Sequence, residues 1–240
     1  MDRTLTADGF VELLAAQVSA DELAKVQRYF KLGPGDYGEG DVFVGVAMRD
    51  VFALAKEHVD MPVGEIDRLL DSPVHEVRAG ALNIMDKAAR RKRTPDERRQ
   101  ALYELYLRRM DRINNWDLVD LAAPYVVGGY LADYDRPREV LYDLARSADM
   151  WERRTAMLAT LYFARQKDLD DIYGIATILL HDDEDLIHKA VGGMLREAGK
   201  HDRQRLLAFL DQHAAEMPRT MLRYAIEHLD PDQRAHYRGL

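Results

Sequence analysis

The feature that most constrains the fold of this chain is a loose internal repeat with a period in the mid-thirties. Four segments each begin with a capping or turn element, followed by a basic residue, a spacer, a small apolar residue and an amphipathic helical pattern. Their basic residues, separated by 76, 35 and 34 positions, are Arg78, Arg154, Lys189 and Arg223. The first gap is about twice the others, so a further copy is expected at about residues 116–120. This period predicts stacked pairs of short helices.

Helical spacing extends through most of the chain, as in Val77, Ala81 and Ile84, and strict alternation is nearly absent. The glycine-rich stretch 33–41 predicts a loop, ordered by Tyr37 and Phe43 packing nearby. We expect one all-α domain over residues 1–240, an α-solenoid of HEAT or TPR type with a helical cap at about residues 1–28. In such a solenoid the second helices of successive pairs line one concave surface. The alternative is a helical bundle in which the four matches arise by chance.

The composition excludes several classes of protein and site. The chain has 240 residues and no cysteine, which rules out a disulfide framework, a thiol nucleophile and cysteine-ligated metal centres. The eight histidines are scattered, so neither a metal nor a cofactor is expected. The start of the chain lacks a secretory signal pattern, and no segment approaches the ~18 apolar residues of a membrane span. A soluble cytoplasmic protein with no membrane partner is expected.

The net charge of −8 argues at first against a nucleic-acid partner. However, residues 87–112 hold ten basic and four acidic residues, and Trp116 follows directly. Such a run is most often a solvated loop between helices, but its position also suits phosphate binding. The candidate DNA-binding residues, including two from the repeats, are Lys87, Arg90, Arg91, Lys92, Arg93, Arg112, Lys189 and Arg223.

The first of the two tryptophans, Trp116, lies in the expected additional repeat. Asp117 and Asp120 share roughly one helix face, and Asp120 is one turn beyond Trp116. An indole beside a carboxylate can hold a cationic group. The alternative is that Asn115 or Asp117 caps the helix and Trp116 packs in the core.

The second tryptophan, Trp151, is followed by Glu152 and the adjacent arginines Arg153 and Arg154. Neighbouring residues point to different helix faces, so one arginine can form a surface ion pair while the other reaches a phosphate. The alternative is an ion pair with Glu152 on the helix surface.

Taken together in order, these motifs resemble the AlkD-like DNA alkylation repair family. The resemblance covers about residues 29–226 and is carried by five segments. They are the glycine loop after Tyr29-Phe30-Lys31, Trp116-Asp-Leu-Val-Asp120, Trp151-Glu-Arg-Arg-Thr-Ala156, Leu186-Ile-His-Lys-Ala-Val-Gly-Gly193 with its continuation to Glu197, and Met217-Pro-Arg-Thr-Met-Leu-Arg-Tyr-Ala-Ile226.

The resemblance implies HEAT-like repeats whose concave face binds duplex DNA, and a monofunctional glycosylase that excises N3- or N7-alkylated purines. By the same resemblance, Trp116 would pack against the lesion nucleotide, Asp120 would be the catalytic carboxylate, and Arg154 would hold the DNA backbone. It implies no metal and no cofactor, and we expect a monomer. Family members are described as working without flipping the base into a pocket, unlike most glycosylases.

Two positions depart from the family pattern. Gly193 stands where a tryptophan usually forms the other wall of the lesion site. Either the cleft admits a bulkier adduct, such as a large N3-alkyladenine, or activity on small lesions is reduced; a neutral packing variant is the third possibility. Ala47-Met48-Arg49 replaces an Arg-Val-Pro sequence, which affects either a helix start or one DNA contact.

The alternative function is a non-catalytic repeat protein that binds DNA structures or a protein.

Overall fold

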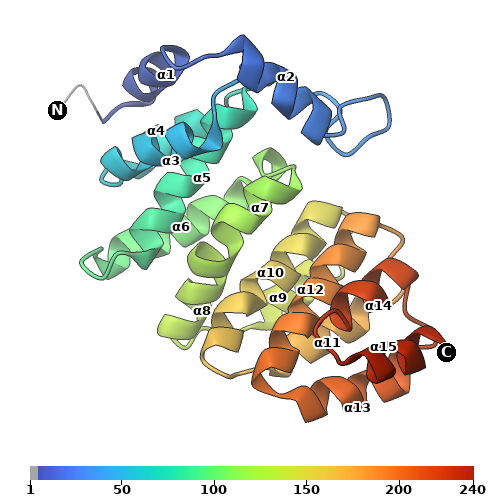
Figure 1. The fold of residues 1–240 in the computed structure, drawn as a ribbon. Coiled ribbons are helices and arrows are strands. Elements are labelled where there is room, and N and C mark those ends of the chain that lie inside the picture. Colours follow the sequence, from blue (N-terminus) through green and yellow to red (C-terminus); the bar gives the residue numbers. More distant parts are fainter. Residues whose placement is uncertain (1–4) are drawn as a thin grey trace. The chain divides into compact units, whose positions relative to one another are not determined.

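The computed structural model describes residues 5–240, and in this range the chain is all-α, as the sequence predicts (Figure 1). An isolated bridge between Val42 and Val74 is the β pairing found among these residues. The chain divides into two compact units, Met1–Tyr130 and Leu131–Leu240. Residues 1–4 of the expected N-terminal cap lie outside the described residues. Within residues 5–240, no helix is both long and apolar enough to cross a membrane.

The first unit is built from short helices that pair along the chain. They are α1 (Ala7–Ala15), α2 (Ala20–Tyr29), α3 (Met48–Glu57), α4 (Val63–Leu70), α5 (His75–Arg90), α6 (Asp96–Arg108), the 3-10 turn η1 (Met110–Arg112), α7 (Trp116–Ala122) and the π-helical segment η2 (Ala123–Gly128). The short helix α8 (Gly129–Asp133) contains the boundary between the two units.

Helix α5 is the centre of the first unit, because α3, α4 and α7 all pack against it. All of its residues except Lys87 and Arg90 are buried. Small residues allow neighbouring segments to come close: a Cβ added at Gly80 would lie 2.4 Å from the ring of Phe10 in α1. A helix covered on every side needs partners for its polar residues as well as for its apolar ones.

One of these polar residues, Glu76, holds the segment that leads into α3. Its buried carboxylate accepts the N–H groups of Val44 at 3.1 Å and Gly45 at 2.8 Å. Gly45 has a φ of +85°, and a Cβ there would lie 2.4 Å from the carbonyl oxygen of Ser19. The predicted glycine-rich loop at residues 33–41 is confirmed, because no helix occurs there. The segment that follows it is fixed to the first turn of α5 by Glu76.

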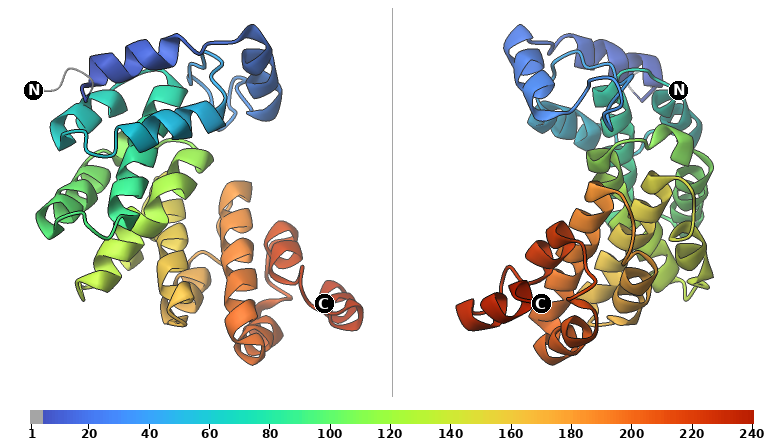
Figure 2. Two further views of the ribbon diagram at one scale, coloured as in Figure 1. Left: turned by 60° about the vertical axis from the view of Figure 1, so that its left-hand side comes forward. Right: turned by 90° about the vertical axis from the view of Figure 1, so that its right-hand side faces the viewer.

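The second unit repeats the pairing of helices. Its helices after α8 are α9 (Glu139–Leu144), α10 (Met150–Arg165), α11 (Asp170–Ile178), α12 (Asp185–His201), α13 (Arg203–His213), α14 (Arg219–Ala225) and α15 (Pro231–Arg238). Helices α10, α12 and α14 lie side by side in that order, each the second member of a pair (Figure 2). The prediction of a helical-repeat fold with a period in the mid-thirties is confirmed.

The alignment of the repeats needs one correction, at Arg78. Four of the proposed equivalent residues occupy the fifth position of their helices, namely Asp120, Arg154, Lys189 and Arg223, whereas Arg78 is fourth in α5. Arg78 donates to the carbonyls five and six residues before it, and Arg153 makes the same two contacts. Arg153 is therefore the counterpart of Arg78. The sequence did not distinguish Arg153 from Arg154, because the two are adjacent. The contacts with the carbonyls before the helix show which of them corresponds to Arg78.

Two consecutive glycines in α12 have different surroundings. A Cβ at Gly192 would lie 2.4 Å from the carbonyl oxygen of Met221 in α14, so this glycine allows the two helices to approach closely. A Cβ at Gly193 would meet nothing within 4 Å. Packing within the second unit therefore requires glycine at the first position and not at the second.

We expect alanine substitutions at these two positions to have opposite effects on stability. Gly192→Ala should lower the free energy of unfolding by about 1–3 kcal/mol, because a methyl group is forced into a backbone contact. Gly193→Ala should raise it by up to about 1 kcal/mol, because alanine favours the helix and the space is open. Urea unfolding followed by circular dichroism measures both. Equal effects of the two changes would contradict the contact between α12 and α14.

Candidate functional site

Helix α7 begins at Trp116 because Asn115 caps it. Asn115 is extended, with φ −150° and ψ 155°, and its side-chain oxygen accepts the N–H of Trp116 at 2.8 Å. Asn115 is thus the cap that the sequence offered as an alternative role. Leu118, Val119 and Ala122 are buried, whereas the other side chains of this helix are partly exposed.

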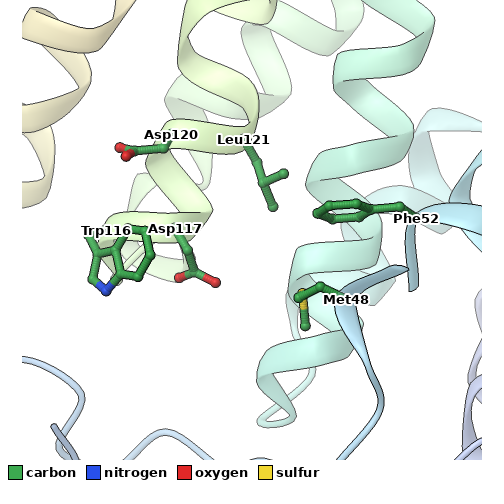
Figure 3. A pocket seen from close by; sticks show the side chains of 6 residues that line it. All are labelled: Met48, Phe52, Trp116, Asp117, Asp120 and Leu121. Atoms are coloured by element: carbon green, nitrogen blue, oxygen red, sulfur yellow. The ribbon is translucent and has the colours of Figure 1, made fainter. Parts of the chain in front are cut away.

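The outward face of α7 and the start of α3 form a pocket of about 250 Å³ (Figure 3). Its lining residues are Met48, Phe52, Trp116, Asp117, Asp120 and Leu121. Figure 3 shows Leu121 directed toward Phe52, while the carboxylate of Asp120 points away from α3. The structure therefore brings Trp116 and Asp120 together in one pocket. Met48 belongs to the segment that departs from the family pattern, and it begins α3 without a side-chain cap.

Aromatic side chains cover another part of Trp116. The ring of Phe30 is stacked on it, with centroids 5.8 Å apart and an angle of 21°, and the ring of Tyr29 meets it edge-on at 6.0 Å. Phe43 is buried against Phe30 at 5.0 Å, as expected beside the glycine-rich loop, and the hydroxyl of Tyr37 accepts the N–H of Lys31 at 3.3 Å. Trp116 is thus half-buried: it both packs in a cluster and lines the pocket.

Behind the pocket lies a buried polar network that was not evident from the sequence. His75, at the start of α5, places Nε2 2.7 Å from Asp117 and Nδ1 3.2 Å from Asp41. Asp41 also accepts hydrogen bonds from Arg78 and from the side chain of Asn115, the latter at 2.8 Å. The cap of α7 is therefore part of the same network as the pocket residue Asp117.

The network has strongly shifted ionisation. Burial opposes the charged form of His75, but hydrogen bonds to Asp117 and Asp41 outweigh it and raise the pKa of His75 to about 9. Burial also opposes the charged form of Asp41, but hydrogen bonds from His75 and Asn115 and the charge of Arg78 lower its pKa to about 2. At neutral pH His75 is therefore an imidazolium and Asp41 a carboxylate.

An indole with carboxylates around a small pocket suits a planar cationic ligand. The ring offers its π-face, and a carboxylate stabilises positive charge where water is partly excluded. No group of three or more histidine, aspartate or glutamate residues among residues 5–240 is arranged to hold a metal ion.

Three residues predicted to contact DNA belong to the second unit. Arg154 is buried, and its guanidinium donates to the carbonyl of Leu186 at 2.7 Å. Lys189 pairs with Asp185 at 2.7 Å. Arg223 is exposed, with its guanidinium carbon 5.4 Å from the ring centroid of Tyr224. Their predicted roles in DNA binding stay predictions.

The basic run 87–112 has two kinds of member. Arg91 pairs with Asp60, and Arg112 donates to the carbonyls of Leu70, Asp71 and Ser72, so both are used to hold the ends of neighbouring helices. Arg98, Arg99 and Arg109 likewise have protein partners. Arg108, at the end of α6, pairs with Asp67 at 2.9 Å. The remaining four lie near the end of α5: Lys87 is half-buried, Arg90 packs 4.3 Å from the ring of Tyr125, and Lys92 and Arg93 are exposed.

The His75 network predicts how stability depends on pH. The folded-state pKa of about 9 lies above the ordinary value of 6.5, so the contribution of His75 is complete below pH 6.5 and is lost as the pH rises through 9. The shift corresponds to roughly 3 kcal/mol. Urea unfolding of wild type and His75→Gln should therefore differ most at pH 6 and least at pH 9.5. A difference that stays constant over this range would contradict the network.

Comparisons with known proteins identify a family and a solved structure of similar fold. The family described as DNA alkylation repair enzyme matches residues 11–229. A solved structure described as a predicted DNA alkylation repair enzyme from Enterococcus faecalis has a similar fold, with a TM-score of 0.68 and 18% sequence identity. The match covers 90% of this chain and 98% of that one. A comparison with curated proteins finds no match. The family match covers most of the sequence, and the chain belongs to the DNA alkylation repair enzyme family.

Proposed function

We propose that this protein is a DNA glycosylase that hydrolyses the N-glycosidic bond of N3- or N7-alkylated purines in duplex DNA, as a step of base excision repair. The observation that carries the proposal is that Trp116 and Asp120 line one pocket in a chain of the DNA alkylation repair enzyme family. Its place of action would be cytoplasmic DNA, and it would act as a monomer.

The reaction needs few catalytic groups from the protein. Alkylation at N3 or N7 makes the purine cationic, so the electrons of the breaking C1′–N bond pass to a base that leaves neutral without being protonated. The sugar becomes oxocarbenium-like, water adds to C1′, and its proton passes to a carboxylate or to solvent. One carboxylate can stabilise the sugar cation and orient this water, which makes the second carboxylate of glycoside hydrolases unnecessary. We assign that role to Asp120.

The other assigned residues would hold the substrate. Trp116 would contact the cationic nucleotide through its π-face. Arg154 would clamp a phosphate near the lesion, with its guanidinium oriented by the carbonyl of Leu186. A Cβ at Gly193 would meet nothing within 4 Å, so packing within the second unit does not require this glycine, and its role would be to leave room for a bulky N3-alkyladenine.

The decisive experiment measures release of free base by mass spectrometry from two duplexes, one methylated and one carrying a bulky N3-adenine adduct. We expect wild type to release base and Asp120→Asn to be slower by about 10²–10³-fold, because the variant lacks an electrostatic stabiliser of the transition state. Glu57→Gln, which removes one negative charge from the exposed end of α3, is the matched control and should keep full activity. Equal release by Asp120→Asn and wild type, with folding intact, would refute the role of Asp120.

The same assay separates this function from the alternative, a repeat protein that binds DNA structures or a protein without catalysis. Duplex binding with a steep salt dependence but no release of any base from either substrate would favour the alternative.

Binding of unmodified duplex tests the basic run. Lys92→Gln combined with Arg93→Gln should weaken binding and reduce the slope of log K against log salt by about 0.9 for each phosphate that the variant no longer neutralises. Lys56→Gln combined with Lys167→Gln removes the same charge from exposed positions outside the run and should leave the slope nearly unchanged. Equal slopes for the two double variants would show that Lys92 and Arg93 do not bind phosphates.

A further inference from the structure

His75 is bonded at both ring nitrogens in the interior of the first unit. Its side chain is fully buried, and both of its partners are carboxylates, Asp41 and Asp117. A neutral imidazole carries one N–H, so it can donate to only one of two ionised carboxylates. The two contacts, at 3.2 and 2.7 Å, favour the imidazolium, which donates from both ring nitrogens.

Every element packed against His75 contributes to its surroundings. Asp41 faces it from the glycine-rich loop, Asp117 faces it from α7, and Arg78 of its own helix reaches it through Asp41. The ring of Phe43 is stacked on the imidazole with centroids 4.5 Å apart, and Phe30 lies at 5.3 Å. Phe43 covers one face of the imidazole, Phe30 meets it at an angle of 57°, and the carboxyl groups contact both ring nitrogens.

The network ends at the residues that line the pocket. On one branch, Asp41 accepts a hydrogen bond from Asn115, and Asn115 caps α7 at the N–H of Trp116. On the other branch, Asp117 lines the pocket directly, three residues before Asp120. His75 is therefore linked to the start of α7 twice, through Asp41 to the cap residue Asn115 and directly to Asp117.

We propose that His75 is a positioning residue for base release: its doubly bonded imidazolium holds the first turn of α7, and with it Trp116 and Asp120, in the arrangement that the reaction needs. This inference rests on the proposed glycosylase function. The imidazolium also neutralises Asp117, which reduces the repulsion that two carboxylates three residues apart on one helix would exert on each other.

Loss of the proton from His75 has a specific consequence. One of the two carboxylates then faces a ring nitrogen with a lone pair, and a buried anion without its donor is costly. Asp41 keeps its donors Arg78 and Asn115, whereas Asp117 has no other side-chain donor of this kind within residues 5–240, so we expect the start of α7 to shift. Because the pKa of His75 is raised to about 9, this change belongs to the alkaline range, whereas an ordinary histidine would titrate near 6.5.

The test compares wild type, His75→Gln and the control His58→Gln in single-turnover base release from pH 6 to 10. His58 is another buried histidine of this unit, bonded to the carbonyl of Leu54 and outside the pocket. A Trp151→Phe background leaves Trp116 as the single tryptophan, so its fluorescence reports on α7. Histidine NMR follows the protonation of His75 in the same proteins.

We expect the rate constant of wild type to fall with a midpoint near pH 9, together with the Trp116 fluorescence and the NMR titration of His75. His75→Gln should lower this rate constant by about 10- to 100-fold, as misplacement of reacting groups does, while its affinity for unmodified duplex stays close to that of wild type. His58→Gln should behave as wild type. If the role of His75 were purely structural, His75→Gln would lower the melting temperature but would not lower the rate constant while leaving the affinity for duplex unchanged.

Three results would overturn the proposal. They are an active wild type whose rate constant is flat through pH 9, a His75→Gln variant as fast as wild type, and a His75 that titrates near 6.5. If His75→Gln does not fold, the wild-type pH profile and NMR titration still decide. If wild type releases no base at all, the proposed function fails, whereas coincident fluorescence and NMR titrations near pH 9 would still support the positioning of α7 by His75.

Discussion

The first turn of α5 is the part on which the rest of the first unit depends. It places His75, Glu76 and Arg78 in the interior, where charge without a partner costs several kcal/mol. Their partners come from the loop before α3, through Asp41 and the backbone of residues 44–46, and from the start of α7. The loop and α7 are therefore held at one end of α5.

Buried ion pairs of this kind seldom add stability beyond what well-packed apolar residues would provide. Their main consequence here is that they fix the orientation of the side chains involved. An apolar contact leaves a side chain free to slide, whereas a carboxylate bonded to an imidazole nitrogen at 2.7 Å is held in distance and angle. Asp117 is fixed in this way, and Asn115 ties the cap of α7 to the same network. The pocket of Trp116 and Asp120 is built on this rigid start.

The basic run shows the limit of counting charges along a sequence. Residues 87–112 carry an excess of positive charge, yet Arg91, Arg109 and Arg112 are bonded to the ends of neighbouring helices. Arginine suits this use because its planar group donates to several carbonyl or carboxylate oxygens at once. The exposed members, Lys92 and Arg93, remain the stronger candidates for contact with DNA.

The sequence by itself determined the helical class, the repeat period and the presence of Trp116, Asp117 and Asp120 on one helix, because these depend on residues at most a few turns apart. It also located the glycine-rich loop. Only the tertiary structure decided that His75 bonds residues 34 positions before it and 42 positions after it, that Met48 and Phe52 complete the pocket, and that Arg78 aligns with Arg153. Periodicity reports which face of a helix is buried, whereas the partners of a buried charge depend on how distant segments pack.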